Sequence, residues 1–148
     1  MTVTHRPTLS LAVQYAVSAT GKPTRAQFRR WVRAALEHDA QIVLRIVGQK
    51  EGRALNASYR NKDYATNVLT FVLQDKAPLE GDLALCAPVV AREARAQKKT
   101  LTAHYAHLSV HGVLHLQGYD HQTDADAQVM EQREAQIMAK LGYADPYR

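Results

Sequence analysis

Four segments of the chain have the hydrophobic pattern of strands. Residues 8–17 alternate leucine, valine and tyrosine with smaller or polar residues, and a period of two is typical of a half-buried strand. Three further runs, at 41–47, 66–73 and 81–86, are rich in β-branched and other apolar residues, as buried strands are. The pattern therefore predicts a small sheet of about four strands.

Five other segments are predicted to be helices, at 24–37, 52–63, 88–98, 101–116 and 123–141. Thr24 and Gln27 have the spacing of a capping box, and Gly118 and Gly142 follow the last two helices, as C-terminal caps often do. Helices and strands are mixed without strict βαβ alternation, which favours an α+β fold with helices packed against a mixed sheet. No repeat or linker-like segment divides the 148 residues, so we expect one domain over 1–148.

The composition narrows the class of protein. With 46% hydrophobic and 22% charged residues the chain is close to the globular average, which argues against a disordered or fibrous protein. No apolar run approaches the roughly 18 residues of a membrane span, and the first residues lack the layout of a signal peptide. The single cysteine, Cys86, has no partner for an internal disulfide, as suits a reducing compartment. We therefore expect a cytoplasmic protein with no membrane partner.

The net charge of +5 is unevenly distributed along the chain. Residues up to Gln74 include 11 basic and 4 acidic side chains, a balance of +7, whereas the rest includes 8 basic and 10 acidic ones, a balance of −2. Arg25, Arg29 and Arg33 form a basic stripe on the first predicted helix. Such asymmetry favours a polyanionic partner, although a solvated basic surface explains it equally well.

Five of the seven histidines fall between His104 and His121. His111 and His115 are four residues apart and share one face of a helix, and a turn at Gly118 would let His121 return to the same point. Three imidazoles are one ligand short of the tetrahedral shell of zinc, and such an open position is typical of catalytic zinc. The spacing therefore predicts one zinc ion per chain, held by three histidines.

The neighbours of these histidines leave several alternatives open. His107 is close enough to be a hydrogen-bond partner behind a ligand, whereas His104 is expected at the rim of a pocket. Asp120 could orient an imidazole or form a turn. Cys86 would close the zinc shell if the fold brought it to the metal, but a single buried cysteine is usually a small hydrophobic residue.

The spacing HxxxHxxGxxH is also that of the metzincin proteases, in which a glutamate general base follows the first histidine. Here that position is Gly112, so the usual means of activating water for peptide cleavage is missing. A metalloprotease would need another residue to replace the glutamate.

The tract HGVLHLQGYDH, preceded by AHLSV, resembles the signature of the YbeY family of bacterial rRNA maturation factors, which are metal-dependent endoribonucleases. The tracts LNASYRNKDYATNVLTF and GDLALCAPVVAREA resemble two further segments of that family. One departure is Val72, which stands where the family often has proline. The residues before the second predicted strand carry no diagnostic motif.

This resemblance implies that His111, His115 and His121 hold zinc in a cleft beside the sheet and that Arg60 is the family's functionally important arginine. An arginine there could grip a phosphate and stabilise transition-state charge. The resemblance also implies that the protein cleaves single-stranded RNA, matures 16S rRNA in ribosome quality control, and contacts the small ribosomal subunit and its assembly proteins, with no DNA partner. The alternative is an RNA-binding assembly factor whose metal site is structural and which cleaves little or no RNA.

Overall fold

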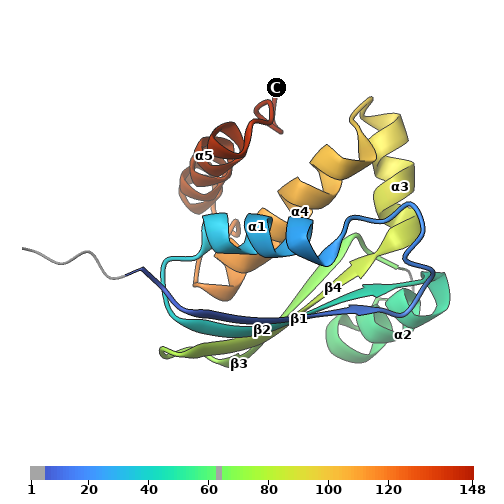
Figure 1. Ribbon diagram of the computed structural model, residues 1–148, viewed down its shortest axis with the longest axis horizontal. Coiled ribbons are helices and arrows are strands. Elements are labelled where there is room, and N and C mark those ends of the chain that lie inside the picture. Colours follow the sequence, from blue (N-terminus) through green and yellow to red (C-terminus); the bar gives the residue numbers. More distant parts are fainter. Residues whose placement is uncertain (1–5, 63–64) are drawn as a thin grey trace, which may run out of the picture.

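The computed structural model describes residues 6–62 and 65–148, which form four strands and five helices (Figure 1). Every element predicted from the sequence is present within a few residues of its expected bounds, and the α+β class is confirmed. In chain order the elements are β1 (Leu9–Tyr15), α1 (Arg25–Ala35), β2 (Ala40–Val47), α2 (Gln49–Arg60), β3 (Val68–Gln74), β4 (Leu79–Cys86), α3 (Ala87–Ala96), α4 (Leu101–Leu116) and α5 (Asp124–Leu141).

Helix α2 differs most from its predicted range of 52–63. It begins at Gln49, with Gly48 in the N-cap position, and it ends at Arg60. Asn61 adopts a left-handed conformation with φ 55°, which ends the helix before the predicted limit because left-handed residues are typical helix terminators. Residue 63, the last of the predicted helix, lies outside the described residues.

The sheet is mixed, as expected, with the strand order β1-β2-β4-β3. Strands β1, β2 and β4 are parallel, and β3 pairs antiparallel with β4 at one edge. Strand β3 continues through Val72 to Gln74 with a register shift between these two residues. The valine that departs from the family pattern therefore lies within the strand, and the pairing is irregular just beyond it.

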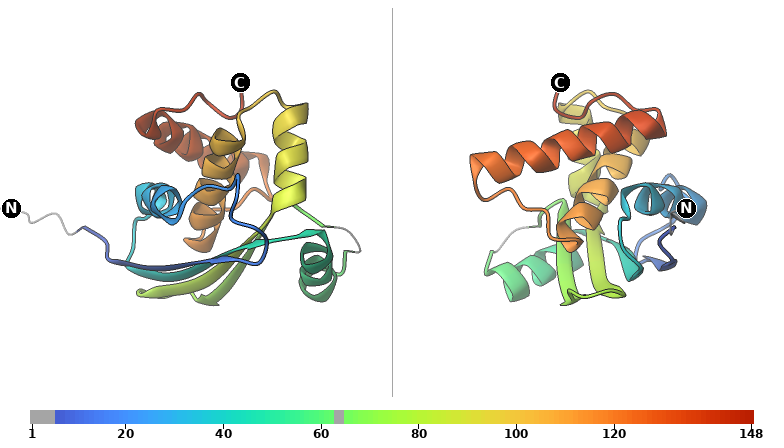
Figure 2. Two further views of the ribbon diagram at one scale, coloured as in Figure 1. Left: turned by 45° about the vertical axis from the view of Figure 1, so that its right-hand side comes forward. Right: turned by 90° about the vertical axis from the view of Figure 1, so that its left-hand side faces the viewer.

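Helices α1, α3, α4 and α5 lie on one side of the sheet, with α5 packed on α4 and α1. Helix α2 lies away from α1, α4 and α5 and contacts β4 and α3 (Figure 2). Helix α4 contacts α1, α3, α5, β3 and β4. Tyr105 of α4 packs edge-to-face on Phe28 of α1, which in turn packs edge-to-face on Trp31. Among the described residues, no helix is both long and apolar enough to cross a bilayer.

Two glycines allow α4 to pack close to the sheet. A Cβ at Gly112 would lie 2.9 Å from Cδ2 of Leu83 on β4, and a Cβ at Gly81 of β4 would clash with Leu116. Gly112 therefore faces the sheet, with His111 beside it on the helix.

The C-terminal end of α4 is fixed by Gln117. Its side-chain oxygen accepts hydrogen bonds from the backbone N–H groups of Glu37 (2.6 Å) and His38 (3.2 Å), and its amide nitrogen donates to the Ala35 carbonyl (2.8 Å). These contacts tie the last turn of α4 to the connection between α1 and β2. The helix end that carries His115 is thus held in place from a distant part of the sequence.

Candidate metal centre

The imidazoles of His111, His115 and His121 lie side by side. The first two come from the last two turns of α4, and Gly118, with φ 101°, turns the chain after the helix. The Tyr119 N–H donates to the Leu114 carbonyl (3.1 Å), a bond typical of a glycine-terminated helix. The His121 ring then stands 5.5 Å from the His111 ring and 6.0 Å from the His115 ring, measured between ring centres.

Two of the three imidazoles have one nitrogen already bonded within the protein. His111 Nδ1 is 3.1 Å from Oε1 of Glu134, and His115 Nδ1 is 3.0 Å from the Tyr119 carbonyl oxygen. Both partners accept hydrogen bonds, so each Nδ1 carries the proton and each Nε2 keeps its lone pair. Metal-binding histidines in proteins are typically held in this way.

Three imidazoles are ligands of the type and number that catalytic zinc sites have, and their ring centres are nearly as close together as in such a site. The ring centres of two imidazoles on one tetrahedral zinc lie about 5 Å apart. The exposed His121 ring lies nearly parallel to the other two rings, at 22° to the His111 ring and 19° to the His115 ring. Across residues 6–62 and 65–148, no three His, Cys, Asp or Glu side chains are placed so that they could hold a metal ion as they stand. A zinc ion here would therefore require a rearrangement of these side chains.

The three histidines line a groove with a volume of about 720 Å³ that also contains Arg60. Arg60 is the last residue of α2 and is exposed, so the structure brings the predicted arginine to the same groove as the predicted ligands. Asp120 lines the groove as well, and its Oδ1 accepts a hydrogen bond from the His121 N–H (2.7 Å), a contact within the turn. The remaining wall is strand β3, which supplies residues 68–73.

An apolar rim of the groove was not predicted from the sequence. Tyr59, Val72 and Leu73 are three of the five large hydrophobic side chains that are exposed in the described part of the chain, and all three line this groove. The Tyr59 ring is 68% exposed and lies 4.5 Å from the Phe71 ring, centre to centre. Clustered exposed apolar side chains commonly mark a binding surface.

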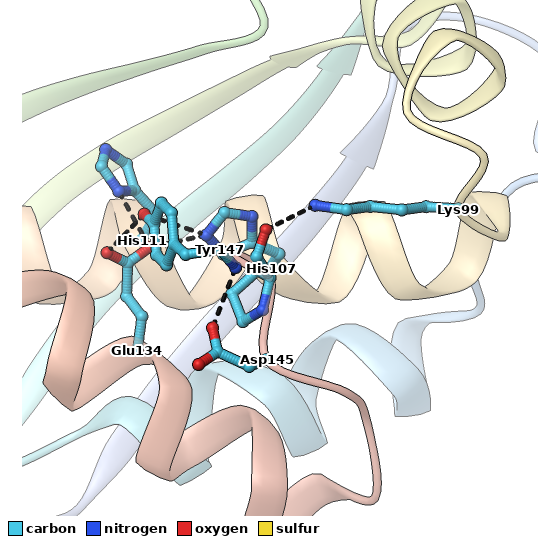
Figure 3. A network of polar contacts seen from close by, with 7 residues as sticks. Lys99, His107, His111, Glu134, Asp145 and Tyr147 are labelled. Carbon is cyan, nitrogen blue, oxygen red and sulfur yellow. Dashed lines mark hydrogen bonds and ion pairs between the residues drawn. The ribbon is translucent and has the colours of Figure 1, made fainter.

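Glu134 is a second residue that the sequence reasoning missed. It reaches from α5 to the histidines of α4 and is completely buried (Figure 3). Burial is the largest single influence on its pKa and raises it, but hydrogen bonds from His107 and His111 and the electrostatic attraction of both rings together lower the pKa to about 2. The available signal was a charged residue within the apolar stripe of α5, which consists of Met130, Ile137, Met138 and Leu141.

The chain resembles known proteins over nearly its whole length. The family profile described as Endoribonuclease YbeY matches residues 14–142. The chain belongs to the YbeY family. Two similar curated relatives, both named Endoribonuclease YbeY, come from Nitrosomonas europaea and Nitrosomonas eutropha. The first is 57% identical over 97% of this chain and 87% of the relative, and the second is 60% identical over 93% of this chain and 97% of the relative.

A solved structure supports the fold. The solution structure of TM1509 from Thermotoga maritima matches with a TM-score of 0.57 and 21% sequence identity, covering 93% of this chain and 99% of that one. At this level of identity the likeness concerns the arrangement of helices and strands.

The other residues singled out in this YbeY-family sequence have different surroundings. His107 donates a hydrogen bond from Nε2 to Glu134 (2.7 Å). It therefore contacts the carboxylate behind His111 and does not bond directly to a predicted zinc ligand.

The prediction for His104 is wrong: it is only 3% exposed, and its Nε2 is 2.9 Å from Glu93 of α3. Helix α3 packs against α4 at this position and covers His104, so His104 does not lie at a pocket rim. Cys86 is buried in a separate cluster with residues 47, 65 and 89 and does not line the groove.

The basic stripe lies on the other side of the molecule from the groove. Helix α1 packs on β1, α4 and α5, whereas the groove follows β3, and β1 and β3 are the two edges of the sheet. Arg25 lies 4.9 Å over the Tyr15 ring, and Arg33 donates to the Pro7 carbonyl (3.2 Å). Two of the three arginines of the basic stripe thus have contacts within the protein.

Proposed function

We propose that the protein is a zinc-dependent endoribonuclease that cleaves single-stranded RNA. The observation that carries the proposal is the shared groove of His111, His115, His121 and Arg60. Relatives that are 55% identical or more over nearly the whole chain and are named endoribonucleases support an RNA-cleaving hydrolase. On the family resemblance, we assign its role to 16S rRNA maturation and ribosome quality control in the cytoplasm, with the small ribosomal subunit and its assembly proteins as partners.

The residues of the groove have separate roles in this proposal. His111 and His115 would hold one zinc ion through Nε2, with His121 as the third ligand. When bound, the ion supplies Lewis acidity for hydrolysis of a phosphodiester at neutral pH. Arg60 extends into the same groove, and its planar guanidinium can bind two phosphate oxygens and stabilise the negative charge that grows on them.

The apolar rim accounts for a preference for single strands. The exposed Tyr59 ring and its neighbour Phe71 can stack on a nucleobase, and only an unpaired base can turn its face to a protein side chain. Tyr59 precedes Arg60 in the sequence, so a base on the tyrosine would place the adjoining phosphate near the guanidinium. This arrangement binds RNA without requiring a specific base sequence.

The partial opening of the site favours catalysis over a structural metal. The His111 side chain is 22% exposed and His121 is exposed, so a metal here would be reachable from the groove. A structural zinc site is usually closed by four protein ligands.

The test compares the zinc-loaded native protein with His115→Ala at equal folded fraction, using a labelled single-stranded oligoribonucleotide. We expect the native protein to cut the RNA and the variant to lose this activity. Chemical analysis of the new RNA ends then distinguishes attack by water from attack by the RNA 2′-hydroxyl. A zinc-loaded native protein that binds the RNA and leaves it intact would contradict the proposal and favour the assembly factor.

A further inference from the structure

Glu134 is bonded to a predicted zinc ligand and to the end of the chain at the same time. Its Oε1 lies 3.1 Å from His111 Nδ1 and 2.7 Å from His107 Nε2, and its Oε2 accepts a hydrogen bond from the Tyr147 hydroxyl (2.9 Å). Figure 3 shows the Glu134 carboxylate, which comes from α5, meeting the histidines of α4 and the tyrosine of the C-terminal segment. All the partners of Glu134 in this network are hydrogen-bond donors.

A carboxylate with this position controls how His111 can bind a metal. A carboxylate accepts hydrogen bonds, so it holds the proton on His111 Nδ1 and leaves the lone pair on Nε2. It also limits rotation of the ring, because a rotated ring would lose the bond. His115 is held in the same way by the Tyr119 carbonyl. Nδ1 is therefore hydrogen-bonded in both of the predicted ligands that come from α4.

We propose that Glu134 is the positioning residue that orients His111 for zinc, and that Tyr147 secures Glu134. This inference rests on the proposed zinc site and goes beyond it, because it assigns part of the metal affinity to α5 and to the last residues of the chain. Carboxylates behind metal-binding histidines typically contribute about 10- to 100-fold in metal affinity or activity.

The C-terminal segment is itself held in place next to the site. The Lys99 ammonium group, just before α4, donates to the Pro146 carbonyl (2.9 Å), and the Tyr147 N–H donates to Asp145 Oδ1 (2.9 Å). The Tyr147 ring also packs edge-to-face on the His107 ring, 5.3 Å between centres. These contacts fix the tyrosine so that its hydroxyl meets the second carboxylate oxygen of Glu134.

The chain offers a matched control for Glu134. Glu93 of α3 accepts a hydrogen bond (2.9 Å) from Nε2 of His104, which is on α4 like His111. Glu93 has no hydrogen bond to a predicted zinc ligand. A glutamine at either position removes the carboxylate charge and keeps the side-chain size. A loss that is specific to Glu134 would therefore reflect its contact with His111.

The experiment measures the zinc dissociation constant of the folded protein by competition with a chelator. We expect Glu134→Gln to weaken zinc binding by about 10- to 100-fold, and Glu93→Gln to bind zinc as the native protein does. Tyr147→Phe, which loses only the hydroxyl bond to Glu134, should weaken binding by a smaller factor. Equal zinc affinity in native protein and Glu134→Gln would overturn the role of Glu134, and native affinity in Tyr147→Phe would overturn that of Tyr147.

A measurement on the native protein covers the case in which Glu134→Gln does not fold. Nitrogen NMR of the zinc-loaded protein should find the His111 proton on Nδ1 and the metal on Nε2, and the opposite assignment would overturn the inference. If the native protein binds no zinc, the proposed zinc site itself is wrong. If it binds zinc and Glu134→Gln binds it equally, only the positioning role fails.

Discussion

The two halves of helix α4 carry the same kinds of residues in different surroundings. In the N-terminal half, His104 is 3% exposed and bonded to Glu93 of α3, which also accepts hydrogen bonds from the Asn67 amide (3.1 and 3.3 Å). In the C-terminal half, His111 is bonded to Glu134 but its ring reaches the groove. The His104–Glu93 pair is therefore structural, because α3 covers it. The His111 ring borders the groove, so it can meet a ligand there.

Removing the two predicted zinc ligands in the C-terminal half of α4 should have the largest effect. His111→Ala combined with His115→Ala removes two of three donors, so zinc content should fall from one ion per chain to none and RNA cleavage should be lost. Elemental analysis and a cleavage assay measure both. His104→Gln is the control from the other half, and it should keep zinc and activity. Full zinc content in the double variant would contradict the comparison.

Replacing Arg60 tests the chemistry of the groove while all three predicted zinc ligands are kept. If the guanidinium acts mainly on the transition state, Arg60→Ala should lower the single-turnover cleavage rate by about 100- to 1000-fold at saturating protein, with a much smaller loss of RNA affinity. Arg60→Lys should rescue poorly, because an ammonium group lacks the two-pronged geometry. An intact saturated rate with reduced affinity would make Arg60 a docking residue.

Tyr59 should contribute to RNA binding through stacking. Stacking is worth about 1–3 kcal/mol per base, so Tyr59→Ala should weaken binding of a non-cleavable single-stranded oligonucleotide by about 5- to 150-fold. Tyr59→Phe keeps the ring and should bind normally. An oligonucleotide with abasic sites should respond little to either change. Fluorescence anisotropy measures these affinities, and an unchanged affinity in Tyr59→Ala would place RNA elsewhere on the protein.

The smallest effect is expected from the pH response of the buried half. Burial lowers the pKa of His104 from its ordinary value of 6.5, against the opposing influence of Glu93. The fold therefore favours the neutral ring, and this stability is complete above pH 6.5 and is lost as the pH falls below it. His104→Gln stays neutral, so its free energy of unfolding should fall less than that of the native protein between pH 7.5 and 5. Urea titrations in the presence of a chelator measure the difference. Parallel pH profiles would show that His104 does not contribute.

The local patterns of the sequence were sufficient for the elements and for the convergence of the histidines. The period of two predicted β1, and the four-residue spacing of His111 and His115 with a glycine turn placed His121 beside them. These features depend on residues close together in the chain. Gly112 could be recognised as lacking a carboxylate, but only the packing on Leu83 shows that this position faces the sheet.

The parts that were missed depend on how separate helices and strands pack against one another. Glu134 is 23 residues from His111, and its meeting with that ring requires the angle at which α5 packs on α4. The error for His104 also comes from packing, because the way in which α3 folds back against α4 and covers His104 cannot be read from the helical pattern of either segment. Tyr59 and Phe71 come together only when the end of α2 is placed beside β3.

The central claim is that the exposed half of α4 and the following turn form a three-histidine zinc centre, and X-ray absorption at the zinc edge tests it most directly. The spectrum of the zinc-loaded protein should show three imidazole nitrogens at about 2.0–2.1 Å, no sulfur, and one further light ligand. A sulfur at about 2.3 Å, which only Cys86 or a methionine could supply, or fewer than three imidazoles, would contradict the account.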